Sequence, residues 1–286
     1  MEFRTLKEEI LNISSQYGIT LRKNQGQCFL INEQVADFII RYGALDADRD
    51  VVLEIGPGFG CLTQKIIQNA KETIVIENDR KLSKYLREKF VHNENISIIT
   101  QDAIKTTFPK HSKLISNVPY QISGPLIQKI VESKEKADII ILMLQEEFIR
   151  RMQSLPQAKG YGRLSVIAQL LFQIEDLKRV SPYDFYPQPQ IESGIVKLTF
   201  NPEYVNNPYL GHFMEFLAGI FPFKNKILPK ALSFLKKNID NFPKLQFLRN
   251  LDIDSCVGTD MKNKRLFQLL PREIWNFFKK IQIKNT

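Results

Sequence analysis

The pattern of apolar and polar positions is clearest around one short apolar run that ends in a glycine-rich turn. Val51–Ile55 predicts a buried strand, and Gly56–Gly60 predicts a tight turn. Leu62, Ile66 and Ile67 then recur at helical spacing. Because glycine has no side chain, such a turn can bring backbone N–H groups and a helix N-terminus close to a ligand. The chain is organised around this strand–turn–helix unit.

Short apolar runs and amphipathic segments alternate through most of the chain up to residue 200. Further strands are expected at 73–77, 96–99, 114–116 and 137–144, and helices at 6–17, 33–42, 82–90, 126–131, 145–152 and 163–172. This alternation predicts an α/β fold with a mainly parallel sheet and helices on both faces. Two late strands, 177–180 and 194–200, flank the proline-rich segment Phe185–Pro189, which we expect to be a loop.

Four residues stand at the ends of successive predicted strands. They are Gly56, Glu77, Asp102 and Asn117. Ligands of parallel sheets bind beyond the carboxyl ends of the strands, so we expect these residues to meet in one crevice. Glu77 also lies at the distance, ~20 residues beyond the turn, where an acid binds ribose hydroxyls in βαβ nucleotide sites.

The alternation stops after Phe200, and Asn201–Pro208 has the composition of a linker. We therefore expect one domain over residues 1–203 and a second, smaller all-helical domain over residues 204–286. The second carries 14 Lys and Arg against 6 Asp and Glu, a net charge of +8, whereas the first carries 26 − 25 = +1. Such a basic domain suggests a nucleic-acid partner; a lysine-rich solubilising surface is the alternative.

Several function classes are disfavoured by composition. Cys28, Cys61 and Cys256 lie far apart without metal-ligand or disulfide spacing, so no metal site is expected. The charged N-terminus does not resemble a signal peptide, and the most apolar run, Ile139–Leu144, is too short to cross a membrane. We expect a soluble cytoplasmic protein.

The turn itself has the spacing E-x-G-x-G-x-G from Glu54 to Gly60. This resembles the first motif of S-adenosylmethionine-dependent methyltransferases, and implies a Rossmann-like class I methyltransferase sheet. A nicotinamide fingerprint would require glycine at Cys61, which disfavours an oxidoreductase.

Asn117-Val118-Pro119-Tyr120 matches the N-P-P-Y-type motif of amino-group methyltransferases, with valine in the second place. An adenine amine is a poor nucleophile, and acceptors aimed at its hydrogens stabilise the charge that develops on nitrogen. The Asn117 side-chain oxygen and the Val118 carbonyl are the candidate acceptors, and Tyr120 offers a ring on which the base can stack.

Phe185 could stack on the other face of a flipped-out base, or could be a core aromatic under its loop. Arg150, Arg151 and Arg163 could contact phosphate or be solvated, and Arg163 could instead order its own loop.

Taken together, the motifs resemble those of the rRNA adenine dimethyltransferases of the KsgA type. They are Gly26–Leu30, Glu54–Gly60, Glu77, Asp102-Ala103, Asn117–Tyr120, Gln145–Glu147, Tyr161–Ser165 and Phe185–Ser193, in this order. The likeness covers roughly residues 22–200, and the motif sequences are more similar to those of archaeal and eukaryotic members than to those of most bacterial ones. It implies dimethylation of two adjacent adenosines near the 3′ end of small-subunit rRNA, within a pre-ribosomal particle. We expect a monomer without a membrane partner.

The resemblance also implies roles for individual residues. Gln27, Cys28 and Leu30 would line the methionine side of S-adenosylmethionine, next to the glycine turn of Gly56 and Gly58. Glu77 would bind the ribose hydroxyls and Asp102 the cofactor's adenine amine, and Asn117 would lie between cofactor and target. The expected catalytic group is Asn117, Pro119, Tyr120 and Phe185.

The likeness extends to Phe213–Leu232, but with one departure. Lys224-Asn225-Lys226 stands where many relatives have an arginine-rich motif. Lysine offers phosphate a point charge rather than a bidentate fork, which affects RNA docking rather than the chemistry.

Two other functions stay open at this stage. One is a resistance-type methyltransferase of large-subunit rRNA, which is disfavoured by Cys28 and by the sequence of Tyr161–Ser165. The other is a non-catalytic RNA-binding assembly or transcription factor, against which the intact Asn117, Pro119 and Tyr120 speak.

Overall fold

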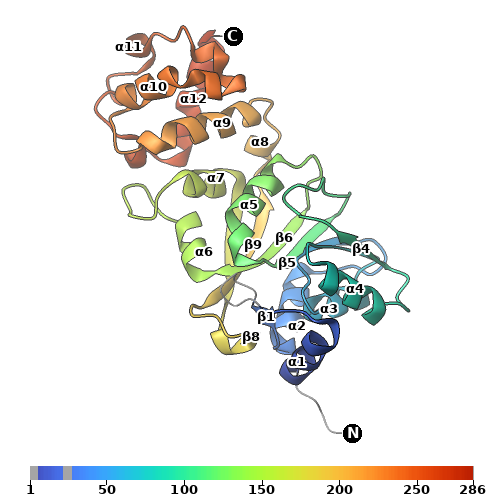
Figure 1. Ribbon diagram of the computed structural model, residues 1–286. Coiled ribbons are helices and arrows are strands. Elements are labelled where there is room, and N and C mark those ends of the chain that lie inside the picture. Colours follow the sequence, from blue (N-terminus) through green and yellow to red (C-terminus); the bar gives the residue numbers. More distant parts are fainter. Residues whose placement is uncertain (1–5, 22–27, 286) are drawn as a thin grey trace. The chain divides into compact units, whose positions relative to one another are not determined.

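The computed structural model, which describes residues 6–21 and 28–285, contains a mixed seven-stranded sheet (Figure 1). The strand order is β4-β3-β2-β5-β6-β9-β7. The first five strands in this order are parallel to one another and β9 is antiparallel to β6, so the expected mainly parallel sheet is confirmed. The strands are β2 (Val51–Ile55), β3 (Glu72–Glu77), β4 (Ile96–Thr100), β5 (Lys113–Asn117), β6 (Ile139–Gln145), β7 (Phe172–Val180) and β9 (Ser193–Phe200).

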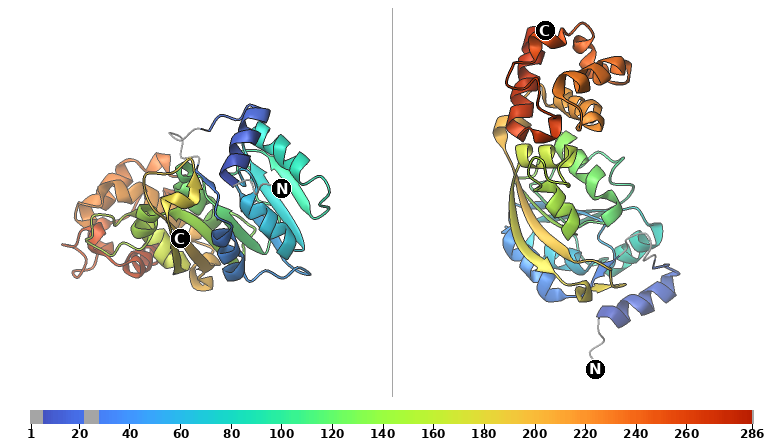
Figure 2. Two further views of the ribbon diagram at one scale, coloured as in Figure 1. Left: turned by 90° about the horizontal axis from the view of Figure 1, so that it is seen from below. Right: turned by 90° about the vertical axis from the view of Figure 1, so that its left-hand side faces the viewer.

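The central strands are apolar along their whole length because both faces of the sheet are covered. Leu53 lies beside Leu114, which lies beside Ile140, and all three are almost fully buried. The next pair in register, Ile115 and Ile141, is fully buried on the other face. Such continuous apolar runs are typical of parallel strands with helices on both sides. Helices are seen on each side of the sheet in Figure 2.

The helices begin where the sequence supplies N-terminal caps. The Asn32 side chain accepts a hydrogen bond from the N–H of Gln34 before α2, and Asp79 accepts from Lys81 and Leu82 before α4. α2 and α3 pack against the sheet through Ile39, Leu62 and Ile66, among other buried residues. The helices up to β7 are α1 (Leu6–Tyr17), α2 (Glu33–Gly43), α3 (Cys61–Asn69), α4 (Arg80–Lys89), α5 (Ser123–Glu132), α6 (Glu146–Met152) and α7 (Arg163–Leu171).

Two strand predictions need correction. β7 begins at Phe172, directly after α7, five residues earlier than the expected start at 177, and only its first and last residues, Phe172 and Val180, are fully buried. The proline-rich segment was expected to be a loop throughout, yet β8 (Phe185–Tyr186) pairs antiparallel with β1 (Phe29–Leu30). A two-residue strand that stops before Pro187 avoids the missing N–H donor of proline.

The chain forms two compact units. The first comprises Met1–Ile149 and Ile174–Thr199, and the second comprises Arg150–Gln173 and Phe200–Thr286. The segment 150–173, which precedes the boundary expected near residue 203, thus packs in the second unit. There the Tyr161 hydroxyl donates a hydrogen bond to the Leu269 carbonyl.

The second unit is helical and has an aromatic core. The rings of Phe213, Trp275 and Phe278 lie within 4.8–6.1 Å of one another, centroid to centroid. Its α-helices after β9 are α8 (Pro202–Val205), α9 (Leu210–Ile220), α10 (Leu228–Lys237), α11 (Ile253–Cys256) and α12 (Pro271–Asn285). No helix within residues 6–21 and 28–285 has both the length and the apolar character needed to cross a bilayer.

Candidate active site

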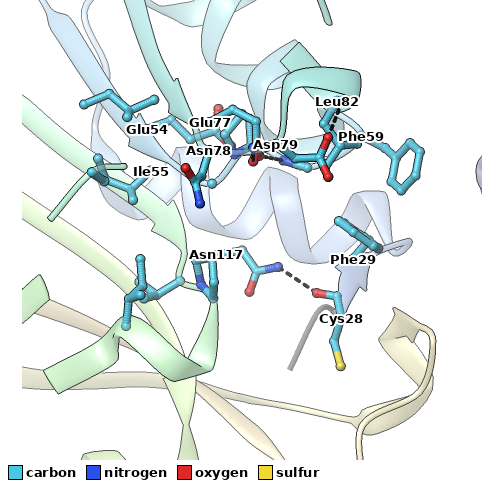
Figure 3. A pocket seen from close by; sticks show the side chains of 18 of the residues that line it. Cys28, Phe29, Glu54, Ile55, Phe59, Glu77, Asn78, Asp79, Leu82 and Asn117 are labelled. Atoms are coloured by element: carbon cyan, nitrogen blue, oxygen red, sulfur yellow. Dashed lines mark hydrogen bonds between the residues drawn. The ribbon is translucent and has the colours of Figure 1, made fainter. Parts of the chain in front are cut away.

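A cavity of about 710 Å³ lies at the carboxyl ends of the parallel strands (Figure 3). It is within the usual size range of small-molecule sites, ~300–1,000 Å³. Its walls come from the turn after β2 and from the ends of β3, β4 and β5, with further residues from the segment around β1. Of the residues expected in the site, Cys28, Leu30, Gly56, Gly58, Glu77, Asp102, Asn117, Pro119 and Tyr120 all line it.

The glycine turn packs directly against two other segments of the site. Gly56 has φ +66°, and a Cβ there would lie 2.8 Å from the Pro119 ring. Gly58 has φ +58°, and a Cβ there would lie 2.6 Å from the Phe29 ring. Any larger residue would therefore have a strained backbone. It would also displace Pro119 if placed at position 56, or Phe29 if placed at position 58.

Glu77 at the end of β3 is a buried carboxyl held by backbone donors. It accepts hydrogen bonds from the N–H of Asp79 at 2.8 Å and of Gly58 at 3.4 Å. Burial raises the pKa of this carboxyl to about 7, although these N–H groups act in the opposite direction. The side chain is thus oriented and poised between its neutral and ionised forms near pH 7.

Glu54 inside β2 is buried more completely still. It accepts a hydrogen bond from the Thr63 hydroxyl at 2.7 Å, which ties the first turn of α3 to the strand. Burial, together with the charge of Glu77, raises the pKa of Glu54 to about 8, although the hydrogen bond from Thr63 acts in the opposite direction. At neutral pH, Glu54 is therefore a protonated structural group.

Asp102 and the β1 residues form the remaining walls. Asp102 accepts the N–H of Ile104 at 2.9 Å through one oxygen, and its other oxygen lies 3.9 Å from Lys105 Nζ. Leu30 is nearly buried and belongs to the hydrophobic cluster beside α2, whereas Cys28 is half-buried.

Asn117 is oriented by the β1 segment. Its Nδ2 donates to the carbonyl oxygen of Cys28 at 3.3 Å, and Figure 3 shows the side chain reaching across the cavity toward that carbonyl. An amide whose nitrogen is engaged in this way directs its oxygen elsewhere. The arrangement leaves Asn117 Oδ1 available as an acceptor.

Tyr120 lies in a short 3-10 turn, Tyr120–Ile122, right after Pro119. Its hydroxyl is 2.7 Å from Ser193 Oγ, and burial raises its pKa to about 12, so the phenol keeps its proton. Val118 is almost fully buried, and its N–H donates to the Met143 carbonyl at 3.1 Å.

Phe185 is an expected site residue that does not line the cavity. Phe185 is 2% exposed and belongs to the same hydrophobic cluster as Leu30 and Val35, so its placement agrees with the core alternative. Its ring has no face available to a base in this arrangement. Gln27 lies outside the described residues.

Sequence reasoning overlooked Phe29 and Asn78, which also line the cavity. Phe29 packs edge-on against Phe59 with centroids 4.7 Å apart, an arrangement that no periodic pattern signals. Asn78 directly follows Glu77 at the strand end, and this position could have identified it. Among the described residues, no cluster of three or more His, Cys, Asp or Glu side chains could hold a metal ion.

Comparison with known proteins identifies the family. The model for "Ribosomal RNA adenine dimethylase" matches residues 18–260. The chain belongs to this family of rRNA adenine dimethylases. It is similar to a probable ribosomal RNA small subunit methyltransferase A from Pyrococcus abyssi, with 33% identity over 270 residues that cover 94% of this chain and 95% of that protein.

Solved structures agree with this assignment. A dimethyladenosine transferase from Plasmodium falciparum is similar with a TM-score of 0.76 and 28% identity, covering 90% of this chain and 98% of the other. The 23S rRNA methyltransferase ErmE shares the fold, with a TM-score of 0.61 and 24% identity, covering 89% and 99%. The expected Rossmann-like methyltransferase fold is thereby confirmed.

The position of Phe185 predicts how this family member responds to substitution there. Phe185→Ala lowers the free energy of unfolding by about 3–5 kcal/mol because it opens a cavity in the core. Phe185→Leu costs less and leaves methyl transfer within a few-fold of the wild type at a temperature where both are folded. Urea denaturation and incorporation of labelled methyl groups measure the two effects. Severe loss of transfer by a well-folded Phe185→Leu protein would instead indicate aromatic stacking on the base.

The raised pKa of Glu54 predicts a pH dependence of stability. Between about pH 4.5 and pH 8 the folded carboxyl keeps a proton that the unfolded chain has lost, so the unfolding free energy decreases as pH rises. Glu54→Gln mimics the protonated form and lacks this contribution. The variant should therefore gain stability relative to the wild type from pH 5 to pH 8, measured by denaturation at each pH. A constant difference between the two proteins would show that Glu54 is ionised throughout.

Proposed function

We propose that this chain dimethylates the exocyclic amines of two adjacent adenosines near the 3′ end of small-subunit rRNA, with S-adenosylmethionine as the donor. The observation that carries the proposal is the convergence of Glu77, Asp102 and Asn117 with the glycine turn on one cavity. Glu77 offers an acceptor for hydroxyl groups and Asp102 an acceptor for an amine. Asn117 offers a further acceptor within the Asn117–Tyr120 motif. The substrate is inferred from the family and from the names of the relatives.

The cavity suits S-adenosylmethionine in both size and chemistry. Glu77 would accept hydrogen bonds from the ribose hydroxyls, and Asp102 from the adenine amine. The half-buried Cys28 and the apolar Leu30 would lie toward the methionine side, beside Gly56 and Gly58. When bound, the cofactor supplies an electrophilic methyl group on its sulfonium.

The target amine would be held by Asn117 Oδ1 and the Val118 carbonyl. Hydrogen bonds to two acceptors favour a tetrahedral nitrogen with its lone pair directed at the methyl group, and they stabilise the positive charge that develops there. The cofactor would supply its methyl group to this nitrogen, and the resulting ammonium would lose a proton to solvent. Repetition on the same amine yields the dimethyl product.

Tyr120 would stack on the target base, a contact worth ~1–3 kcal/mol in single-stranded nucleic acids. Pro119 would fix the positions of Asn117 and Tyr120 relative to the glycine turn, because its ring packs directly on Gly56.

The second unit would bind RNA phosphates. Lys226 and Lys230 are exposed, whereas Lys224 donates a hydrogen bond to the Tyr161 carbonyl at 2.5 Å. We therefore assign phosphate contacts to the first two and a partly structural role to the third. A pre-ribosomal particle as substrate, a monomeric state and a cytoplasmic location complete the proposal.

The activity test uses small subunits from cells that lack the endogenous dimethylase. Wild-type protein with labelled S-adenosylmethionine should add four methyl groups per subunit and create primer-extension stops at two adjacent adenosines. Asn117→Ala should lower transfer about 100-fold or more through loss of an acceptor. Tyr120→Ala should lower it about 5- to 150-fold and leave cofactor affinity nearly unchanged.

Methylation of large subunits instead would establish the resistance-type activity. Tight subunit binding without any incorporation would support a non-catalytic assembly factor. Equal loss of cofactor binding in both variants would mean that Tyr120 contacts the cofactor.

The pKa of Glu77 predicts that cofactor affinity depends on pH. The ribose hydroxyls donate to the ionised carboxylate, so binding releases the proton that Glu77 carries below about pH 7. The Kd measured by calorimetry should rise by up to about tenfold per pH unit as pH falls below 7. Glu77→Gln should bind weakly and lack this dependence. An affinity that is flat from pH 5.5 to 8.5 in the wild type would remove Glu77 from the ribose site.

RNA affinity should fall steeply with salt because phosphate contacts release counterions. Lys226→Ala and Lys230→Ala should each reduce the slope of log Kd against log salt by about 1. Lys71→Ala, which removes an exposed lysine at the start of β3, serves as the matched control and should leave the slope unchanged. Filter binding to a short small-subunit rRNA fragment measures all four proteins. A flat salt response would place RNA recognition outside these lysines.

A further inference from the structure

Ser193, a buried serine far in the chain from the Asn117–Tyr120 motif, forms a hydrogen bond with Tyr120. Ser193 is fully buried at the start of β9, where it lies opposite Gln145 of β6. Its Oγ is 2.7 Å from the hydroxyl of Tyr120. The two residues are 73 positions apart in the chain, so only the fold brings them together.

This hydrogen bond fixes the hydroxyl end of the Tyr120 side chain, and a second hydrogen bond fixes the Tyr120 backbone. The Tyr120 carbonyl accepts a hydrogen bond from Ser123 Oγ at 3.0 Å, which fixes the backbone of the turn. The phenol keeps its proton over the physiological pH range because burial raises its pKa to about 12. With backbone and hydroxyl both tethered, the ring has one orientation at the wall of the cavity.

Ser193 also ends a segment that is anchored to the cavity at its other end. Tyr186 of β8 pairs with Phe29 of β1, and Phe29 lines the cavity over Gly58. The proline-rich segment between Tyr186 and Ser193 thus connects the wall beside the glycine turn to the ring of Tyr120. Phe185, which directly precedes this segment, is buried in the core and anchors it.

We propose that Ser193 is a positioning residue for methyl transfer, acting through the hydroxyl of Tyr120. This inference rests on the proposed function, in which the target base stacks on that ring. A free hydroxyl would let the ring tilt and spread the base over several orientations. Because attack on a methyl group requires near-linear alignment, misorientation lowers turnover more than cofactor binding.

The experiment is a double-mutant cycle on the full-length protein with undermethylated small subunits. It compares wild type, Ser193→Ala, Tyr120→Phe and the double variant, with kcat, cofactor Kd and thermal midpoint measured for each. Each single variant should lower kcat about 3- to 10-fold, the range of one hydrogen bond, and leave the cofactor Kd unchanged. The double variant should be no slower than the slower single variant, since both substitutions remove the same bond.

Ser112→Ala is the matched control for a merely structural effect. Its hydroxyl is also hydrogen-bonded, to Asp50 at 2.8 Å, but it lies just before β5, at the opposite end of that strand from Asn117. It should lower the thermal midpoint and leave kcat unchanged. A similar loss of kcat in Ser112→Ala would show that the effect of Ser193→Ala on kcat comes from lowered stability of the protein rather than from positioning of Tyr120.

The possible outcomes separate the two proposals. If wild-type protein transfers no methyl groups to subunits, the proposed function fails. If wild type is active but Ser193→Ala retains full kcat, or if the two single effects multiply in the double variant, the positioning role alone is wrong. Non-additive losses of kcat at unchanged cofactor Kd support it.

Discussion

The site depends on direct contact between backbone and ring at two glycines. At Gly56 the turn after β2 packs against Pro119, and at Gly58 it packs against Phe29, with no room for a Cβ at either position. Three segments that are distant in the sequence therefore meet at van der Waals separation. This packing therefore determines the distances between the glycine turn, Pro119 and Phe29 in the wall of the cavity.

The electrostatic character of the cavity follows from the same close packing. Exclusion of water raises the pKa of both Glu54 and Glu77, but the two carboxyls are held differently. Both residues line the cavity, but Glu54 accepts a hydrogen bond from the Thr63 hydroxyl, whereas Glu77 accepts hydrogen bonds from backbone N–H groups. The two neighbouring strands thus supply buried carboxyls with different hydrogen-bond partners.

The hydrogen bonds that orient the catalytic segment come from outside its motif. Asn117 is oriented by the Cys28 carbonyl, and Tyr120 is held by Ser193. Asn117 and Tyr120 belong to one motif of four residues, and two distant segments supply the hydrogen bonds that orient their side chains. This division explains why such a short motif is informative only within its fold.

The sequence by itself determined the strand–turn–helix unit, the parallel sheet and the gathering of Gly56, Glu77, Asp102 and Asn117, because hydrophobic period and strand ends are local properties. It left Phe185 ambiguous, and although Ser193 ends a recognised motif, nothing in the sequence indicated its contact with Tyr120. An aromatic residue or a serine in a loop looks the same whether it faces solvent, ligand or core. The pairing of β8 with β1, the hydrogen bond of Lys224 to Tyr161 and the packing of residues 150–173 in the second unit were likewise decided by tertiary structure. Contacts between residues far apart in the chain depend on the three-dimensional path of the backbone, which no local pattern records.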